Sequence, residues 1–196
     1  MTFAHFYAYN REMIRKIIVL VVFLTLNAFL VYGVYLSKTK FGSVPQEIST
    51  PVPDFSWQDF SGKTHGIHEL RGHTVVIHFW ATWCAPCRSE FPELLNAAKG
   101  DDKGITFLTI SADDTSDVAK KFVLRAQENT DTQDIKNVLF AFDPDKKLSF
   151  DLFQADAFPE TIVVDPKGRM RRKFAGAVNW KGADMTDYLK SLGEKR

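Results

Sequence analysis

Cysteine is scarce in this chain of 196 residues, which contains only two, separated by two positions. A small protein held together by disulfides uses several pairs spread along the chain, because its bridges must close long loops. A structural zinc site would need further cysteine or histidine ligands. The two neighbouring cysteines therefore argue against both kinds of site and indicate redox chemistry.

Excess charge, internal repeats and low-complexity segments are also lacking. The net charge is +1, so no basic field favours nucleic acid as a partner. Hydrophobic residues make up 45% of the chain and charged residues 25%, which is the composition of a globular protein. These averages conceal an uneven distribution. Residues 1–44 carry five Lys or Arg and one Glu, whereas the remainder carries 20 basic and 23 acidic residues.

The N-terminal piece contains one long run without charge, from Ile17 to Leu36. As a helix, this run would span about 30 Å, the thickness of the hydrocarbon core of a bilayer. It is longer than the apolar core of a signal peptide, and no small-residue cleavage site follows it. We therefore expect a cytoplasmic N-terminus over residues 1–16, an uncleaved transmembrane anchor over 17–36 and a polar tether over 37–52. A cleavable signal peptide is the competing interpretation.

Basic residues flank this run, three before it and two after it. This small excess favours a cytoplasmic N-terminus, because basic residues concentrate on the cytoplasmic side of a membrane. The domain over residues 53–196 would then lie outside the inner membrane of a bacterium, in the periplasm or at the cell exterior.

Strand and helix signals alternate along residues 53–196. The pattern predicts a hairpin over 55–67, strands at 74–80, 105–111, 138–142, 161–165 and 169–175, and helices at 85–99, 115–127, 147–153 and 180–192. Such an order of elements indicates an α/β or mixed fold.

The cysteines lie in the segment Trp83-Cys84-Ala85-Pro86-Cys87, between a predicted buried strand and a predicted helix. A helix N-terminus has free amide donors and about half a positive charge, and both stabilise a thiolate. Cysteines placed there reach pKa values of about 3.5–7.5, against about 8.5 unperturbed. We therefore expect Cys84 to be the nucleophile and Cys87, one turn further along, to resolve the mixed disulfide.

The run from His78 to Pro92 resembles the active-site segment of the TlpA/ResA/CcmG(DsbE)-type thioredoxin-like proteins. The resemblance covers about residues 50–193 and includes the segment Phe158-Pro159-Glu160-Thr161. It implies a thioredoxin-like fold, in which a central mixed sheet flanked by helices carries an N-terminal hairpin extension. It also implies a membrane-anchored thiol–disulfide oxidoreductase.

The resemblance further implies roles for the residues around the cysteines. Pro159 would be a cis-proline that faces them, and Phe158, together with Trp83, would contact an extended client segment. Glu90 would relay the proton of the buried sulfur or raise its pKa, and Glu160 would make the client groove acidic. From spacing alone, the favoured interpretation of Glu90 is a solvated helix residue, and the simple alternative for Glu160 is an exposed loop acid.

Two residues depart from the family pattern. His78 stands where relatives often carry asparagine, and a lone histidine in a strand is most simply a satisfied core residue. Phe158 is bulkier than the residue that often precedes the proline, which leaves the shape of the client groove open.

The function implied by the resemblance is the reduction of protein disulfides, such as the heme-binding cysteines of apocytochromes c. A membrane thiol donor of the DsbD/CcdA type would then return Cys84 and Cys87 to the dithiol form. This redox-active pair is the only redox group expected, with no cofactor, metal or nucleic acid. The alternatives are a general reductase or an oxidant with other clients, and a copper-delivery protein on the same fold. Copper delivery would favour a longer cysteine spacing and a further histidine or methionine ligand.

Overall fold

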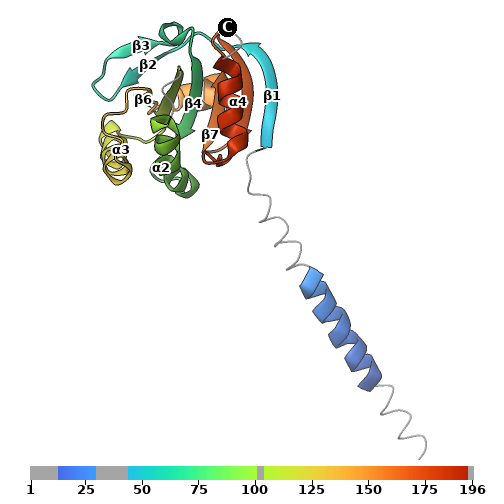
Figure 1. The fold of residues 1–196 in the computed structure, drawn as a ribbon. Helices are drawn as coiled ribbons and strands as arrows, with labels where there is room; N and C mark the ends of the chain where they lie inside the picture. The colour runs from blue at the N-terminus through green and yellow to red at the C-terminus, as the bar shows by residue number, and fades with distance from the viewer. Residues whose placement is uncertain (1–12, 30–43, 101–103, 194–196) are drawn as a thin grey trace, which may run out of the picture. The chain divides into compact units, whose positions relative to one another are not determined.

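The computed structural model describes residues 13–29, 44–100 and 104–193. The chain divides into two units, Met1–Phe41 and Gly42–Arg196, and each is described by itself. In the first unit, residues 13–29 form a helix (Figure 1). Within the described parts of the chain, no helix combines the length and apolar character needed to cross a membrane. Residues 30–36 of the expected anchor lie outside the described residues, as do residues 1–12 and 37–43.

The described part of the second unit is built on an eight-stranded mixed sheet with the strand order β1-β8-β7-β4-β5-β6-β2-β3 (Figure 1). The strands are β1 (Val44–Pro51), β2 (Ser56–Asp59), β3 (Thr64–Gly66), β4 (Thr74–Trp80), β5 (Ile105–Ser111), β6 (Val138–Phe142), β7 (Glu160–Val164) and β8 (Arg169–Ala175). Central strand β4 pairs in parallel with β5 and antiparallel with β7. The predicted mixed α/β architecture is therefore confirmed.

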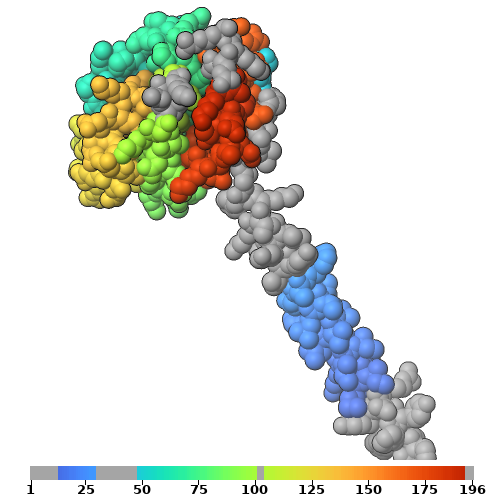
Figure 2. Space-filling view, viewed as in Figure 1, coloured from blue at the N-terminus to red at the C-terminus, as the bar shows by residue number. Residues whose placement is uncertain are grey.

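Helical segments cover the sheet. They are α2 (Ala85–Lys99), α3 (Ser116–Thr130), α4 (Ala183–Gly193), the short 3₁₀ segment η1 (Ile67–Leu70) and the π-helical segment η2 (Lys147–Leu152). On the face shown in Figure 2, α2 and α4 lie side by side and share a shallow groove.

The alternation of side chains along β4 builds two cores. Val76 and Trp80 pack with α2, α3 and α4 on one face, whereas Val75, Ile77 and Phe79 pack with the β2–β3 hairpin, η1 and Phe153 on the other. A strand covered on both faces has no polar side, which explains its continuous apolar run. The polar exceptions are Thr74 at the start of the strand and His78, which is fully buried and packs edge-on against Trp180 at a centroid distance of 6.0 Å.

The assignment of residues 44–51 to the tether is wrong, because they form edge strand β1. This strand pairs antiparallel with β8. Its prolines prevent a helix but not an edge strand, which can carry residues that lack an amide proton. The domain therefore begins before residue 53.

Two helix ends also differ from the expectation. Helix α3 continues to Thr130, where Asp131 closes it in the left-handed conformation with φ 52°. The last helix begins at Ala183 rather than at residue 180. Trp180 consequently lies in the loop before α4, buried against the active-site face of the sheet.

Candidate active site

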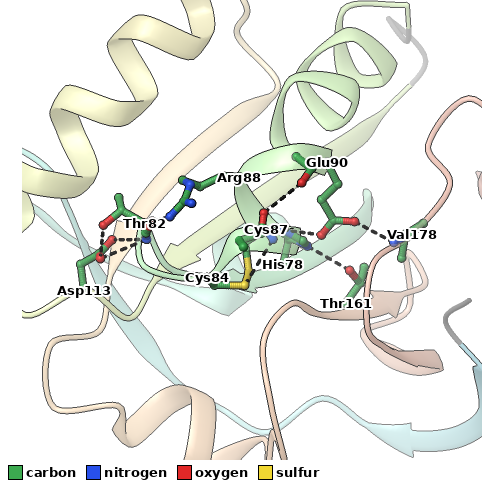
Figure 3. The surroundings of a disulfide bond; sticks show 11 residues. His78, Thr82, Cys84, Cys87, Arg88, Glu90, Asp113, Thr161 and Val178 are labelled. Carbon is green, nitrogen blue, oxygen red and sulfur yellow. Dashed lines mark hydrogen bonds and ion pairs between the residues drawn. A yellow bond between two sulfur atoms is a disulfide. The ribbon is translucent and has the colours of Figure 1, made fainter. Parts of the chain in front are cut away.

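The end of β4 and the start of α2 position the two cysteines. After Trp80 the chain turns, and Cys84 then caps the first turn of α2. Its Sγ accepts a hydrogen bond of 3.2 Å from the amide of Cys87, which is one of the free donors at a helix start. The two sulfurs form a disulfide, so the structure represents the oxidised pair (Figure 3).

The two cysteines differ in exposure. Cys84 exposes 6% of its surface and Cys87 exposes none. A reacting thiolate or disulfide from another protein therefore reaches Cys84 first. In the reduced form, the free amides at the start of α2 favour the thiolate at the same position. The geometry favours Cys84 as the nucleophile and Cys87 as the resolving residue.

A buried aspartate, which the sequence did not single out, holds the loop before Cys84. The Asp113 carboxylate accepts hydrogen bonds from the Thr82 amide at 3.0 Å and from the Thr82 hydroxyl at 2.6 Å. The Ser111 hydroxyl donates to the same carboxylate at 2.8 Å. Arg88 on α2 donates to the Thr82 carbonyl at 2.6 Å (Figure 3). In the sequence, these hydrogen bonds are signalled only by a polar residue just after a predicted strand.

The loop before β7 lies next to this turn. The Phe158–Pro159 peptide bond is cis, as the resemblance implied, and the Pro159 carbonyl accepts a hydrogen bond of 2.9 Å from the Gly176 amide. The ring of Phe158 lies 5.8 Å from that of Trp83, which is 59% exposed. The ring of Phe150 from η2 also stacks on that of Phe158, with 5.2 Å between the ring centroids. Trp83, Phe158 and Phe150 thus form an aromatic surface beside Cys84, and their contact with a client stays a prediction.

Glu90 lies one turn beyond Cys87 on α2 and is buried, so its interpretation as a solvated helix residue is wrong. Its Oε2 accepts a hydrogen bond of 2.7 Å from the Val178 amide, and its Oε1 lies 3.4 Å from Nε2 of His78 (Figure 3). Burial raises the pKa of Glu90 to about 7, although the Val178 amide and the Trp180 indole lower it. A carboxyl group with this pKa can gain or lose a proton near neutral pH.

His78 is a core residue, as expected, but it is also a neighbour of this carboxyl group. Its Nδ1 lies 3.0 Å from the Thr161 hydroxyl, the cross-strand partner on β7. Burial lowers the pKa of His78 to about 3, so its imidazole is neutral at physiological pH. No local pattern indicates that His78 and Glu90 meet, because 12 positions and a change of element separate them.

Glu160 differs from the expectation of an exposed loop acid, because it begins β7 and is only 1% exposed. Its Oε1 lies 3.1 Å from Nζ of Lys173 on β8. Burial raises the pKa of Glu160 to about 6, and Lys173 opposes this rise. Lys173 also donates hydrogen bonds to the carbonyls of Phe153 and Gln154. The observed contacts of Glu160 are therefore inside the domain, and a contact with a client stays a prediction.

His65 on β3 is held by two carboxylates. Its Nε2 lies 3.1 Å from Asp59 and its Nδ1 3.4 Å from Glu69. Within the described ranges, no three His, Cys, Asp or Glu side chains converge as a metal site would require.

A mixed sheet that delivers a helix-capping cysteine pair beside a cis-proline loop defines the thioredoxin-like thiol–disulfide oxidoreductases. Residues 47–192 match the family model described as Redoxin, and the chain belongs to this family. It is 33% identical over 184 residues to the thiol:disulfide interchange protein DsbE of Pseudomonas fluorescens biotype C, covering 92% of this chain and 96% of the relative. It is 32% identical over 184 residues to the thiol-disulfide oxidoreductase ResA of Bacillus anthracis, covering 93% and 97%.

The solved structures that resemble this fold also include a thiol:disulfide interchange protein. A thiol:disulfide interchange protein of the thioredoxin family from Chlorobium tepidum TLS matches with a TM-score of 0.59 and 26% identity, covering 76% of this chain and 99% of that one. The protein is therefore a thiol–disulfide oxidoreductase of the ResA and DsbE type, with Cys84 and Cys87 as its Cys-X-X-Cys pair. Its substrates are client proteins that carry disulfides.

Proposed function

We propose that this protein is a membrane-tethered reductase of protein disulfides that works in the periplasm or at the cell exterior, of the cytochrome c maturation type. The observation that carries the proposal is the asymmetry of the pair, since Cys84 caps α2 and keeps 6% of its surface exposed, whereas Cys87 is fully buried one turn before a buried acid. The first cysteine is placed to meet a client and the second to exchange its proton inside the domain.

The reaction begins with both cysteines reduced. The Cys84 thiolate attacks one sulfur of the client disulfide, and the other client sulfur leaves as a thiolate. Cys87 then gives its thiol proton to the Glu90 carboxylate and attacks Sγ of Cys84. The Cys84–Cys87 disulfide forms and the second client thiolate leaves. The client gains two electrons, this protein loses two, and the client thiolates take protons from Glu90 and from water.

The tether is supported by the uncharged run of Ile17–Leu36. Its described part is helical, and large apolar side chains such as those of Leu20 and Phe23 are more than half exposed within this unit. A membrane would cover such side chains. Tethering would also keep the client, this protein and a membrane thiol donor of the DsbD/CcdA type on one surface, which raises their effective concentration.

The redox step is tested by trapping clients. We expect Cys87→Ser, expressed in its own membrane, to accumulate mixed disulfides through Cys84, because the resolving sulfur is missing. The matched control is the Cys84→Ser/Cys87→Ser double variant, which should trap nothing. Identification of apocytochromes c among the trapped proteins would support the maturation role. The absence of any adduct would contradict the proposed mechanism.

The direction of electron flow is tested by the reduction potential of the Cys84–Cys87 pair. A reductase requires a potential well below that of strong oxidants, which lie near −120 mV. Equilibration with a glutathione or dithiothreitol buffer measures it. A value near that of the strong oxidants would contradict the assignment as a reductase and would indicate an oxidant.

The tether is tested by membrane extraction of the full chain. We expect the protein to stay with the membrane in alkaline carbonate and to be released by detergent. Protease added to spheroplasts should digest residues 53–196, which the proposed orientation exposes. Release by carbonate alone, or protection from protease, would contradict the anchor or its orientation.

A further inference from the structure

A buried series of polar groups connects the cysteine-bearing helix α2 with two neighbouring strands of the sheet. It runs from Glu90 on α2 through His78 on β4 to Thr161 on β7 (Figure 3). His78 and Thr161 are fully buried, and Glu90 is 5% exposed. Among the described residues, Oε1 of Glu90 and Nε2 of His78 have no hydrogen-bond partner, and they face each other at 3.4 Å. Each atom is therefore an available partner for the other, and the Trp180 indole N–H is a further donor near the carboxyl group.

The position of a proton on Glu90 follows from its second oxygen. Oε2 accepts the Val178 amide at 2.7 Å, so it is occupied as an acceptor. A proton taken up by the carboxyl group consequently belongs on Oε1, the atom that faces His78.

The neutral imidazole can serve either state of Glu90, but only by moving its own proton. A neutral histidine has one donor nitrogen and one acceptor nitrogen. When Oε1 carries a proton, it donates to Nε2, and the proton of His78 sits on Nδ1 and donates to the Thr161 hydroxyl. When Glu90 is a carboxylate, Nε2–H donates to Oε1 and Nδ1 accepts from the Thr161 hydroxyl. A hydroxyl can both donate and accept, so Thr161 suits both arrangements.

We propose that His78 is a positioning residue that exchanges its tautomer each time Glu90 gains or loses the proton of Cys87. The exchange keeps both protonation states of the buried carboxyl group hydrogen-bonded. This inference rests on the proton-accepting role of Glu90 in the proposed function and adds a residue to it.

The surroundings of the pair require a tautomer change rather than a change of charge. Burial keeps His78 neutral, with its pKa near 3, while Glu90 titrates near 7. The groups around the pair are the Thr161 hydroxyl, the Val178 amide, the Trp180 indole and Thr109, the β5 partner of His78, whose hydroxyl donates to the Leu139 carbonyl. On α2, Cys87 precedes Glu90 by one turn, and Glu93, which is ion-paired with Lys181, follows it. Glu93 raises the pKa of Glu90, in the same direction as burial.

The direct test is nitrogen NMR of the full chain with ¹⁵N-labelled histidine, titrated across neutral pH in the oxidised and reduced forms. His78 is assigned by its loss in His78→Asn. We expect Nδ1 to carry the proton below the titration of Glu90 and Nε2 to carry it above, with the ring neutral throughout. In Glu90→Gln, the proton should stay on one nitrogen at every pH. A wild-type ring that keeps one tautomer through the titration, or becomes an imidazolium, would overturn the proposal.

A kinetic test separates positioning from a purely structural role. Without the donor at Nε2, the Glu90 carboxylate is less stable, so its pKa rises and it accepts the Cys87 proton only at higher pH. We expect His78→Leu to move the pH midpoint of the resolving step upward by roughly one unit. His78→Asn, whose amide offers a donor and an acceptor, should return part of the shift. Equal midpoints in all three proteins would contradict the role of His78.

The two proposals fail separately. If Cys87→Ser traps clients while the His78 tautomer stays fixed, the reductase stands and the tautomer exchange is wrong. If Cys87→Ser traps nothing, the proposed function falls, whatever the histidine does.

Discussion

Two buried glutamates belong to different elements of the active site, Glu90 to α2 (the α2 side) and Glu160 to β7 (the β7 side), and they differ in their partners. Glu90 on α2 meets neutral groups, namely the Val178 amide and the His78 imidazole. Glu160 on β7 meets the charged Lys173 at 3.1 Å. Burial raises both pKa values, to about 7 for Glu90 and about 6 for Glu160. Burial thus makes a carboxyl group titrate near neutrality, while the charge of its partner decides whether it remains ionised.

The different partners of the two glutamates suit them to different functions. A carboxyl group with neutral partners can take up and release a proton during each turnover without breaking an ion pair. A carboxylate paired with a lysine gains from staying charged, and here the pair joins β7, β8 and the segment after η2. In the proposed mechanism, the α2 side supplies the proton chemistry, and the β7 side supplies the loop that is predicted to contact the client.

The largest expected effect is the loss of proton transfer on the α2 side. Glu90→Gln keeps the shape of the side chain but cannot accept the proton of Cys87. We expect the resolving step at neutral pH to slow by about 10²-fold, the lower end of general acid–base effects, while attack by Cys84 persists. Stopped-flow tryptophan fluorescence with a disulfide peptide would measure both steps.

Two variants provide the comparison for this result. Glu93→Gln removes a neighbouring charge from the same helix without touching the buried carboxyl group, and Glu160→Gln removes the acid on the other side. Glu160→Gln should retain the pH profile of the resolving step, whereas Glu93→Gln should move it only slightly downward, because the charge of Glu93 is a minor cause of the raised pKa of Glu90. A tenfold or greater loss in Glu160→Gln, with none in Glu90→Gln, would reverse the assignment of the two sides.

The second prediction concerns stability against pH. Both folded-state pKa values lie above the ordinary value of 4.5, so the folded state binds these protons more tightly than the unfolded state. Their contribution to stability is complete below about pH 4.5 and is lost as pH rises through about 6 for Glu160 and about 7 for Glu90. From the shifts, Glu90 accounts for about 3 kcal/mol of this loss and Glu160 for about 2 kcal/mol.

Urea unfolding at pH 4.5 and at pH 8, for the wild type and each variant, would measure how much of the pH-dependent loss of stability comes from Glu90 and how much from Glu160. Glu90→Gln should remove more of the pH-dependent loss than Glu160→Gln, because no cation faces Glu90 among its described contacts. A larger share for Glu160 would show that Lys173 does little to hold it ionised, and the comparison would fail.

Much of the fold follows from local patterns in the sequence. The apolar run over residues 74–80 and the alternation around it gave the bounds of β4, and Cys84 stands at the start of a helix as predicted. Strand β1 was missed because its only signal, proline-rich extended chain, is the same for a tether and for an edge strand. Its pairing with β8 is set by residues more than a hundred positions away.

The site is less accessible to such reasoning than the fold. A spacing of three placed Glu90 on the face of Cys87, but its burial depends on Val178, which lies 88 positions away. The burial of Glu160 depends in the same way on Lys173 and on the fold of η2. Local signals describe which element a residue belongs to, whereas the pKa of a carboxyl group depends on which elements later cover it.

The smallest expected effect lies on the β7 side, in the aromatic surface beside Cys84. Phe150 is 40% exposed and stacks on Phe158 with an interplanar angle of 9°. Such a ring pair contributes about 0.5–1.5 kcal/mol beyond its buried area, so Phe150→Ala should raise the KM for a disulfide client by roughly three- to tenfold. The pH profile of the resolving step should not move, because the α2 side is intact. Leu124→Ala, which removes a 50% exposed apolar side chain from α3, is the matched control. A shifted pH profile in Phe150→Ala, or an equal rise in KM in Leu124→Ala, would show that the two sides of the site are not separable in this way.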